Sequence, residues 1–192
     1  MKTNIIRHVL QQSVFKPFIS VIITAFNRDT FLKDAIESAL KQTLDKKVYE
    51  VIVVKNFDWE FDDVYSSRGV KIIKDQSPNL GEMMVHAVDK SLGEIIAFLN
   101  DDDMFMSEKL RIVYKIFKQN PDLIFYHHSA EVIDSKGRRV VKKGFHVRKL
   151  NSLIITKSSQ GLLNVIKIFT NSRYGDSQIA VRRELIEKTR SI

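Results

Sequence analysis

Five apolar residues run directly into a polar segment at Ile95-Ile96-Ala97-Phe98-Leu99-Asn100-Asp101-Asp102-Asp103. A short apolar run of this kind is typical of a strand that is buried on both faces of a sheet. Apolar residues at helical spacing follow from Leu110 to Phe117, so strand and helix alternate as they do in βαβ units. Asn100 to Asp103 are therefore expected at the carboxyl end of a strand, the edge at which open α/β sheets bind ligands.

The same alternation continues outward in both directions and predicts an α/β fold with a mostly parallel sheet and right-handed crossovers. The other expected strands are Ile19 to Ile23, Val48 to Val54, Val70 to Ile73 and Leu123 to His127. Three helices are expected. The first runs from Phe31 to Leu40, with Asp29 or Thr30 as N-cap, and the third from an N-cap at Ser107 to Asn120-Pro121. The second stops at Gly93 and points these residues inward: Met83, Met84, Ala87, Val88 and Leu92.

The two ends of the chain depart from this alternation. Apolar residues at helical spacing predict a short helix from Thr3 to Phe15. Further on, Glu131 to Ile133 and Val140-Val141 flank a turn and predict an antiparallel hairpin. The expected division is an N-terminal extension at residues 1–16, an α/β half at residues 17–134, and a basic part of the same domain at residues 135–192.

Composition narrows the class of protein. The absence of cysteine excludes disulfides and cysteine metal sites, and it fits a reducing compartment. The apolar runs are far shorter than the ~20 residues that a membrane span requires. Met1 to Phe18 lacks the long hydrophobic region of a secretory signal. We therefore expect a cytoplasmic protein.

Positive charge is concentrated near the C-terminus, where residues 136–192 hold 14 Lys and Arg against 3 Asp and Glu. Such a region invites an anionic partner: a phospholipid surface at the inner face of the membrane, a lipid-linked phosphate, a nucleotide diphosphate or nucleic acid. A solvated basic face explains the charge equally well. Nucleic acid is the least favoured partner, because interleaved exposed aromatic residues and a recognised binding motif are missing.

The three successive carboxylates, Asp101 to Asp103, repel one another, and a fold that keeps them together usually supplies a cation. Hard oxygen ligands favour magnesium or manganese, which typically takes one or two protein carboxylates and completes its shell with phosphate oxygens and water. A nucleotide diphosphate is then the expected ligand. A solvated acidic loop at the start of the next helix remains an equal alternative on spacing alone.

Three blocks of sequence carry a resemblance to a known family. They are Ser20-Val21-Ile22-Ile23-Thr24-Ala25-Phe26-Asn27-Arg28, Glu50-Val51-Ile52-Val53-Val54, and the acidic stretch with its preceding Gly93-Glu94. In this order they resemble the inverting family 2 glycosyltransferases of GT-A fold, from Pro17 to Asp134, with a fainter continuation at Ser177 to Glu187. The resemblance implies a three-layer α/β/α fold and sugar transfer, with inversion, from a nucleotide diphosphate to a saccharide, lipid-linked or protein acceptor.

The resemblance also assigns donor-site residues. The end of the first strand contacts the nucleoside in that family, which implicates Thr24, Ala25, Phe26 and Arg28. The family's DxD-type motif implies that Asn100 and Asp101 contact the ribose or diphosphate, and that Asp102 and Asp103 hold the manganese or magnesium ion. Ordinary turn chemistry is the alternative for the first group.

Two further positions are assigned to the nucleotide pocket with open alternatives. Gly81 matches the loop before a crossover helix, although a plain turn explains it equally well. Lys55 stands where the family usually has an acidic residue that reads the base, and an ammonium cannot accept a ring N–H. We expect Lys55 to pair with a phosphate or with Asp58, or to extend along the end of its strand.

A catalytic base is harder to identify. In the resembled family it follows the segment that matches Arg182 to Lys188, and the sequence stops at Ile192, so we expect its counterpart to be missing and the domain to be incomplete. Asp176 is the internal candidate, with a turn residue as the alternative. A metal cluster of His127-His128 with Glu131 is disfavoured, because a strand sends adjacent side chains to opposite faces.

The leading hypothesis is therefore a metal-dependent glycosyltransferase. A module that binds the donor without turnover is the first alternative, and it would explain Lys55 and the missing acid. A basic protein that binds nucleic acid or an anionic surface is the second. A nucleotidyltransferase is excluded, because residues Thr24 to Thr30 contain no glycine and cannot form the glycine-rich phosphate loop.

Overall fold

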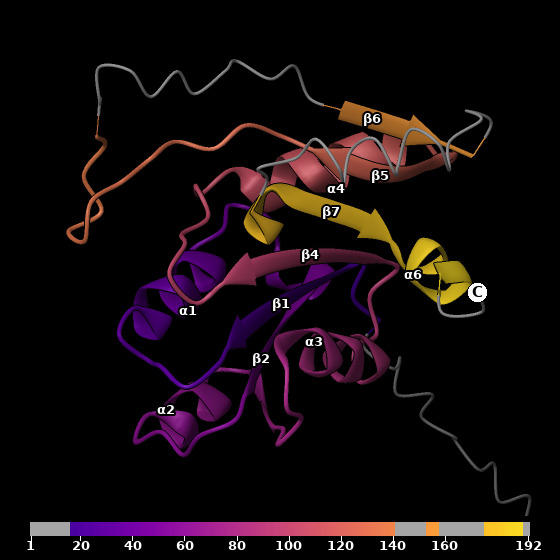
Figure 1. Ribbon diagram of the computed structural model, residues 1–192. Coiled ribbons are helices and arrows are strands. Elements are labelled where there is room, and N and C mark those ends of the chain that lie inside the picture. Colours follow the sequence, from indigo (N-terminus) through magenta and orange to yellow (C-terminus); the bar gives the residue numbers. More distant parts are fainter. Residues whose placement is uncertain (1–15, 141–152, 158–174, 190–192) are drawn as a thin grey trace, which may run out of the picture.

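Seven strands form one sheet at the centre of the protein in a computed structural model, which describes residues 16–140, 153–157 and 175–189 (Figure 1). The strand order is β3-β2-β1-β4-β7-β5-β6. The strands are β1 (Ile19–Ala25), β2 (Tyr49–Lys55), β3 (Val70–Lys74), β4 (Ile95–Asn100), β5 (Leu123–His127), β6 (Leu153–Thr156) and β7 (Ile179–Arg182). The helices are α1 (Leu32–Leu40), α2 (Asp62–Ser67), α3 (Leu80–Asp89), α4 (Lys109–Gln119) and α6 (Arg183–Thr189), with short 3-10 helices η1 (Lys46–Val48) and η2 (Asp176–Gln178).

Strands β3, β2, β1 and β4 are parallel, as the alternation of strands and helices predicts. All seven residues of β1 are buried, because this strand has neighbours on both sides and helices on both faces. The register pairs Thr24 of β1 with Asn100 of β4. The carboxyl ends of these two strands therefore lie side by side, which brings the Thr24 to Arg28 turn next to the acidic stretch.

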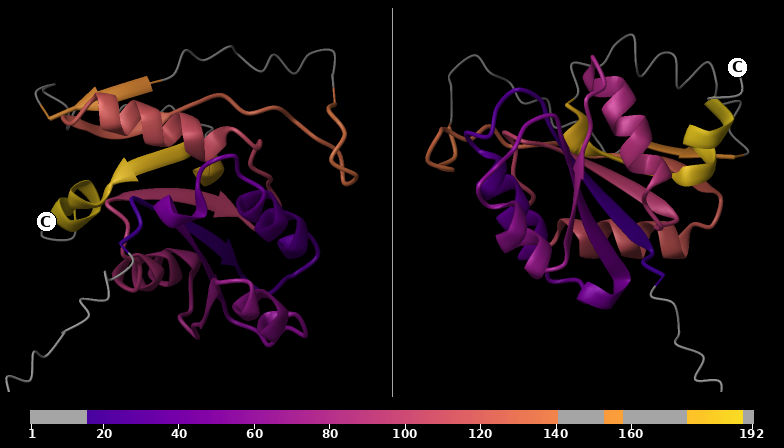
Figure 2. Two further views of the ribbon diagram at one scale, coloured as in Figure 1. Left: turned by 180° about the vertical axis from the view of Figure 1, so that it is seen from behind. Right: turned by 90° about the horizontal axis from the view of Figure 1, so that it is seen from below.

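Two hydrophobic cores cover the two faces of the sheet and make a three-layer α/β/α fold (Figure 2). Alternate residues of a strand point to opposite faces, so Val21 and Ile23 belong to one core and Ile22 to the other. Helices α1 and α4 pack on the first face, and α3 and α6 on the second. The expected α/β/α architecture is confirmed.

The remaining part of the sheet is antiparallel and mixes distant segments of the chain. β7 lies between β4 and β5 and pairs antiparallel with both, and β6 continues the sheet beyond β5. The segment Ser177 to Glu187 does form a strand and a helix, as expected. Its strand lies inside the sheet, so the basic C-terminal part of the chain and the α/β half share one sheet.

The expected N-caps of two helices, α1 and α4, are wrong. The N-cap of α1 is Phe31 and that of α4 is Glu108, and neither makes a side-chain capping hydrogen bond. Asp29, Thr30 and Ser107 lie before these positions. Backbone contacts satisfy part of these ends instead: Leu32 N–H donates to Asp29 O at 3.0 Å and Lys109 N–H to Met106 O at 2.9 Å.

The end of α3 also differs from the expectation. The helix ends at Asp89 with Lys90 as C-cap, so Leu92 lies outside it and is 54% exposed rather than inward. Gly93 therefore does not stop the helix. It is needed for close packing, because a Cβ at this position would stand 2.5 Å from Ser20 N.

The expected hairpin is reduced to one antiparallel bridge between Ile133 and Arg139, with Val140 N–H donating to Val132 O at 2.8 Å. Strands do not form in the described part of this segment, because it extends away from the sheet and finds no further partner (Figure 1). Val141 and the expected helix at Thr3 to Phe15 lie outside the described residues. None of the described helices is long and apolar enough to cross a membrane.

Candidate functional site

The acidic stretch forms a loop after β4, and its three carboxylates have different surroundings. Asp101 is almost buried, with 7% of its side chain exposed, whereas the Asp102 side chain is 41% exposed. Asp103 accepts a hydrogen bond from Ser177 Oγ at 2.6 Å. The mutual repulsion of three adjacent carboxylates is thus relieved by partners from two other segments of the chain. We call Asn100 to Asp103 the acidic loop.

Arg28 supplies the positive charge that faces this loop. Its Nε and Nη2 donate to the two oxygens of Asp101, both at 2.8 Å, and Nη2 also donates to Asp102 Oδ2 at 2.7 Å. The hydrogen bond to Asp101 is the largest influence that raises the pKa of Arg28 above its already high value. Arg28 therefore carries its charge at every pH at which the protein folds.

The turn that carries Arg28 is held in place by the neighbouring strand. Asn27 has a left-handed backbone with φ 58°, a conformation that asparagine adopts more readily than most residues. Its N–H donates to Asn56 Oδ1 at 2.9 Å, and Asn56 Nδ2 donates to Asn27 Oδ1 at 2.7 Å. The ends of β1 and β2 are thereby tied together beside the acidic loop.

The other residues assigned to the donor line up around this edge. Thr24 and Ala25 are buried in β1, and Phe26 is half-buried against the core on the α3 face. Gly81 is exposed in the first turn of α3, two residues after the N-cap Asn79, which accepts from Glu82 N–H at 3.0 Å. Their contact with a donor stays a prediction.

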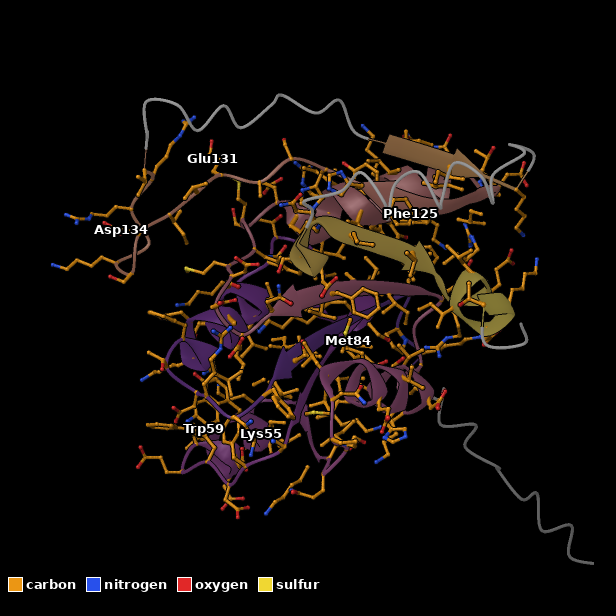
Figure 3. All side chains as sticks on the ribbon, in the orientation of Figure 1. Lys55, Trp59, Met84, Phe125, Glu131 and Asp134 are labelled. Atoms are coloured by element: carbon orange, nitrogen blue, oxygen red, sulfur yellow. The ribbon has the colours of Figure 1, made fainter. Side chains whose placement is uncertain are left out.

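Lys55 is fully buried at the end of β2, close to Trp59 and α2 (Figure 3). Its Nζ donates to Phe57 O at 2.5 Å and to Asp62 Oδ2 at 2.8 Å. The expected partner Asp58 instead pairs with Lys74 at 2.6 Å. The ammonium of Lys55 is thus part of an internal ion pair, and its role in a nucleotide pocket stays a prediction.

Helix η2 faces the acidic loop from the antiparallel part of the sheet, and it carries Asp176. Ser177 Oγ accepts from Asn100 N–H at 3.0 Å while it donates to Asp103, so η2 is attached to the loop on both sides. Burial, and then the charge of Asp103, raise the pKa of Asp176 above its usual value. The fold therefore brings this candidate base to the loop, across 73 residues of sequence from Asp103.

Sequence patterns did not indicate that three further residues lie around this edge of the sheet: Ser177, Gln178 and Lys109. Gln178 Oε1 lies 2.9 Å from Nε2 of His127, and Lys109 Nζ contacts His128 Nε2. Lys109 is 7% exposed, and burial lowers its pKa to about 7. Every Asp and Glu of the sequence lies within the described residues, and none of them is within ion-pair distance of Lys109.

The structure separates the residues of the disfavoured His127, His128 and Glu131 cluster. Glu131 lies on the segment that extends away from the sheet, whereas the two histidines lie at the end of β5 (Figure 3). Burial is the main influence that lowers the pKa of His127. Among the described residues no group of three or more His, Asp and Glu is arranged to hold a metal ion.

That finding limits the kind of metal site that the acidic loop can form. Arg28 binds both oxygens of Asp101 but only one oxygen of Asp102, and Asp103 bonds Ser177 through one oxygen, so Asp102 and Asp103 are the carboxylates with an oxygen left for an ion. Two carboxylates with the rest of the shell supplied by phosphate and water suit magnesium or manganese. The oxygen donors present thus fit an ion that arrives with a diphosphate, and such a site needs no third protein ligand.

An open pocket of about 470 Å³ lies between α1 and residues 104–107, directly after the acidic loop. It is lined by Lys33, Asp34, Glu37, Ser38, Lys41, Met104, Phe105 and Ser107. None of the residues assigned to the donor lines this pocket. The candidate donor residues therefore lie outside this pocket, around the acidic loop, where charged groups from three segments converge.

Known proteins resemble this chain in sequence. The family model described as Glycosyl transferase family 2 matches residues 20–189. An uncharacterized glycosyltransferase of Rickettsia felis is 33% identical over 142 residues, which are 66% of this chain and 22% of that protein. Poly(ribitol-phosphate) beta-N-acetylglucosaminyltransferase TarP of Staphylococcus aureus is 32% identical over 165 residues, which are 80% of this chain and 49% of that protein.

Solved structures agree in fold. The S. aureus TarS 1-349 structure in complex with UDP-GlcNAc has a TM-score of 0.57 at 19% identity and covers 90% of this chain and 47% of that one. The mannosyltransferase PcManGT from Pyrobaculum calidifontis, in complex with GDP-Man and Mn2+, has a TM-score of 0.59 at 15% identity and covers 92% and 47%. These proteins have the GT-A fold, which this chain shares. The chain spans at most about half the length of these relatives.

Proposed function

This chain belongs to glycosyl transferase family 2, and on that premise we propose that it is a glycosyltransferase that uses a nucleotide diphosphate sugar. One observation carries the proposal: the acidic loop, Arg28 and the Asp176 carboxyl meet at the carboxyl edge of the sheet. An acidic loop that could hold a cation and a candidate proton acceptor beside it are the two parts that direct displacement requires.

The donor would lie across the ends of β1 and β4. Thr24, Ala25 and Phe26 lie on the nucleoside side, and Asn100 is the neutral group next to Asp101 that suits a ribose hydroxyl. Arg28 would bind a diphosphate oxygen, for which a guanidinium has suitable donors. The structural neighbours bind UDP-GlcNAc and GDP-Man. We leave the base and sugar of this chain open, because Lys55 replaces the usual base-reading acid and is itself buried.

Asp102 and Asp103 would hold a manganese or magnesium ion together with the diphosphate. When bound, the ion stabilises the negative charge that develops on the departing diphosphate. The exposure of Asp102 supports this assignment, since 41% of its side chain can reach a ligand. Asp103 keeps one oxygen on Ser177 and has its other oxygen available to the site.

Asp176 would remove the proton of the acceptor hydroxyl. The hydroxyl oxygen forms a bond to the anomeric carbon while the bond from that carbon to the diphosphate breaks on the opposite face, which inverts the configuration. A raised pKa makes Asp176 a better proton acceptor than an ordinary aspartate. The acceptor would be a saccharide, lipid-linked or protein hydroxyl, and the basic residues 136–192 would lie on its side or against an anionic membrane.

The proposal is tested by calorimetric titration with a panel of nucleoside diphosphates, with and without manganese. We expect one or more nucleotides to bind only in the presence of manganese, and Asp102→Ala to weaken that binding at least tenfold. A matched Asp122→Ala variant, on an exposed turn before β5, should bind as the wild type does. If no nucleotide binds to the wild type in either condition, the donor site is not where we place it.

Turnover separates an enzyme from a module that only binds. Release of free sugar or its transfer to a mixed acceptor library should be seen with the nucleotide sugar of the base that binds best. A chain that binds nucleotide and manganese but yields neither product over long incubation is the binding module. Nucleic acid is tested in the same series, and we expect no binding of single-stranded DNA or RNA at physiological salt.

A further inference from the structure

Arg28 occupies the carboxylate that the proposed metal site requires. The guanidinium makes a two-point contact with Asp101 through Nε and Nη2, both at 2.8 Å, and it reaches Asp102 Oδ2 at 2.7 Å. Two carboxylates therefore share one positive charge. A divalent ion that approaches Asp102 in this state meets a cation already in place, and like charges at this separation repel each other.

The two contacts of Arg28 differ in strength. Asp101 is almost buried, with 7% of its side chain exposed. Both of its oxygens accept hydrogen bonds from the planar guanidinium, and this bidentate geometry is the strongest for such a pair. Asp102 is 41% exposed and shares a single hydrogen bond. Water competes for that second contact. Arg28 can therefore release Asp102 while it stays attached to Asp101.

A diphosphate would change this balance. It brings negative charge to which both Arg28 and a divalent ion are attracted, so the repulsion between them is replaced by a shared partner. The mutual hydrogen bonds of Asn27 and Asn56 hold the turn before Arg28 in place, so its side chain can turn toward a phosphate without a shift of the backbone. The ion can then bind Asp102, and the diphosphate can bind the ion.

We propose that Arg28 is the resident cation of the acidic loop: it holds Asp101 and Asp102 in the donor-free protein and yields Asp102 to a divalent ion only when a nucleoside diphosphate arrives. Metal and nucleotide then bind with positive coupling, and each raises the affinity for the other by the same factor. This inference rests on the proposed function for its nucleotide half. Its metal half concerns the protein without any nucleotide.

Manganese binding tests the proposal directly, by the electron paramagnetic resonance signal of free ion. Wild type, Arg28→Gln and Arg28→Lys are titrated with manganese alone and with manganese at saturating UDP, a nucleotide bound by a structural neighbour. We expect the wild type to bind manganese at least tenfold more tightly with UDP. Arg28→Gln should bind manganese alone several-fold more tightly than the wild type, with a smaller coupling factor, because the repulsion that the nucleotide relieves is absent.

Arg28→Lys and a second arginine sharpen the result. A lysine keeps the charge but loses the fork, so its manganese affinity without nucleotide should lie between those of the wild type and Arg28→Gln. Arg111→Gln removes an exposed charge that pairs with Glu108 on α4, and it should match the wild type. Far-ultraviolet circular dichroism confirms that each variant is folded; if Arg28→Gln is unfolded, the comparison rests on Arg28→Lys.

Two results would overturn the proposal. The first is an Arg28→Gln protein, or a folded Arg28→Lys protein where that comparison applies, that binds manganese alone no better than the wild type. The second is a wild type whose manganese affinity is the same with and without UDP although UDP binds. A wild type that binds no nucleoside diphosphate contradicts the proposed function instead. In that case the nucleotide-free arm still decides whether Arg28 opposes the metal.

Discussion

Near the carboxyl ends of the parallel strands, Arg28 and Lys55 meet partners of opposite charge, whereas burial is the main influence on three titratable groups in or beside the antiparallel part of the sheet. Arg28 is held by Asp101, and Lys55 by Asp62. In the antiparallel half, burial comes first among the causes that shift the pKa values of Lys109, His127 and Asp176. The raised pKa of Arg28 thus keeps it charged, which suits a diphosphate, whereas the raised pKa of Asp176 suits proton transfer.

Asp176→Asn tests the antiparallel half with the largest expected effect. The amide cannot accept a proton, so we expect turnover to fall by about 10²- to 10⁴-fold, the usual contribution of a general base. Affinity for the nucleotide donor should change by less than a few fold, because η2 remains attached through Ser177. Single-turnover assays together with calorimetry measure the two quantities. A fall in turnover of less than tenfold would assign the base to another residue.

The pH dependence of the same reaction tests whether Asp176 acts in its deprotonated form. Asp176 acts as a base only when it has lost its proton, so the rate constant should rise with pH through its folded pKa and then reach a plateau. Because that pKa is raised, the rise should occur above the range of an ordinary aspartate, near 3.8. In Asp103→Asn the neighbouring charge is absent, and an NMR titration of the metal-free protein should show a lower pKa for Asp176 than in the wild type.

Lys109→Met compares a buried base with an apolar side chain of similar length. A pKa lowered from 10.5 to about 7 means that the unfolded chain binds a proton between these values and the folded chain does not. The free energy of unfolding therefore falls as the pH falls from 10.5 to about 7 and is constant below. Methionine does not titrate, so this loss of stability is absent in the variant. We expect its free energy of unfolding to exceed that of the wild type by about 2 to 4 kcal/mol at pH 7, and the difference to fade toward pH 10.

Urea unfolding at several pH values measures this gain. Lys115→Met, on the exposed side of the same helix, should change the free energy of unfolding little at any pH. A destabilised Lys109→Met protein would mean that the ammonium is charged and bound to a partner in the folded state. The antiparallel half would then resemble the parallel one.

Lys55→Met is the same substitution in the parallel half, and its expected effect has the opposite sign. Lys55 donates to Asp62 and Phe57 O, and both lose a partner when the ammonium is removed. We expect a loss of about 1 to 3 kcal/mol, since two partly buried acceptors are left without a donor. The double variant Lys55→Met with Asp62→Leu should recover part of it in urea unfolding. A neutral Lys55→Met variant would remove the contrast between the two lysines.

Ser77→Ala has the smallest expected effect and leaves the fold intact. Ser77 Oγ donates to Asp75 Oδ1 at 2.5 Å and is the first cause that lowers the pKa of Asp75 to about 2. Without it, the pKa should rise toward the ordinary value of 3.8, although Ser77 N–H and His86 still contribute. An NMR titration of the carboxyl carbon measures the shift. The stability that Asp75 contributes is complete above pH 3.8 and is lost toward pH 2. An unchanged pKa would show that Ser77 N–H and His86, and not the Ser77 hydroxyl, hold it low.

Sequence patterns predicted the parallel half well and the antiparallel half poorly, for a physical reason. The helical and strand periods act over a few residues, and β1 to β4 alternate with helices along the chain. The capping residues were less predictable: backbone contacts took the place of side-chain caps at Phe31 and Glu108. The position of β7 between β4 and β5 leaves no local trace, because its partners lie more than 50 residues away.

By itself the sequence determined that a buried strand ends in Asn100 to Asp103 and that this edge is acidic, because apolar runs and carboxylates are properties of neighbouring residues. Only the tertiary structure decided that Arg28 neutralises Asp101 and that Asp176 faces Asp103, since both pairs are 73 residues apart and depend on the order of strands in the sheet. The same holds for charge state. Among the described residues Lys55 has a carboxylate partner and Lys109 has none, and this difference depends on which groups the fold brings near each buried lysine. The order of residues in the sequence does not specify those groups.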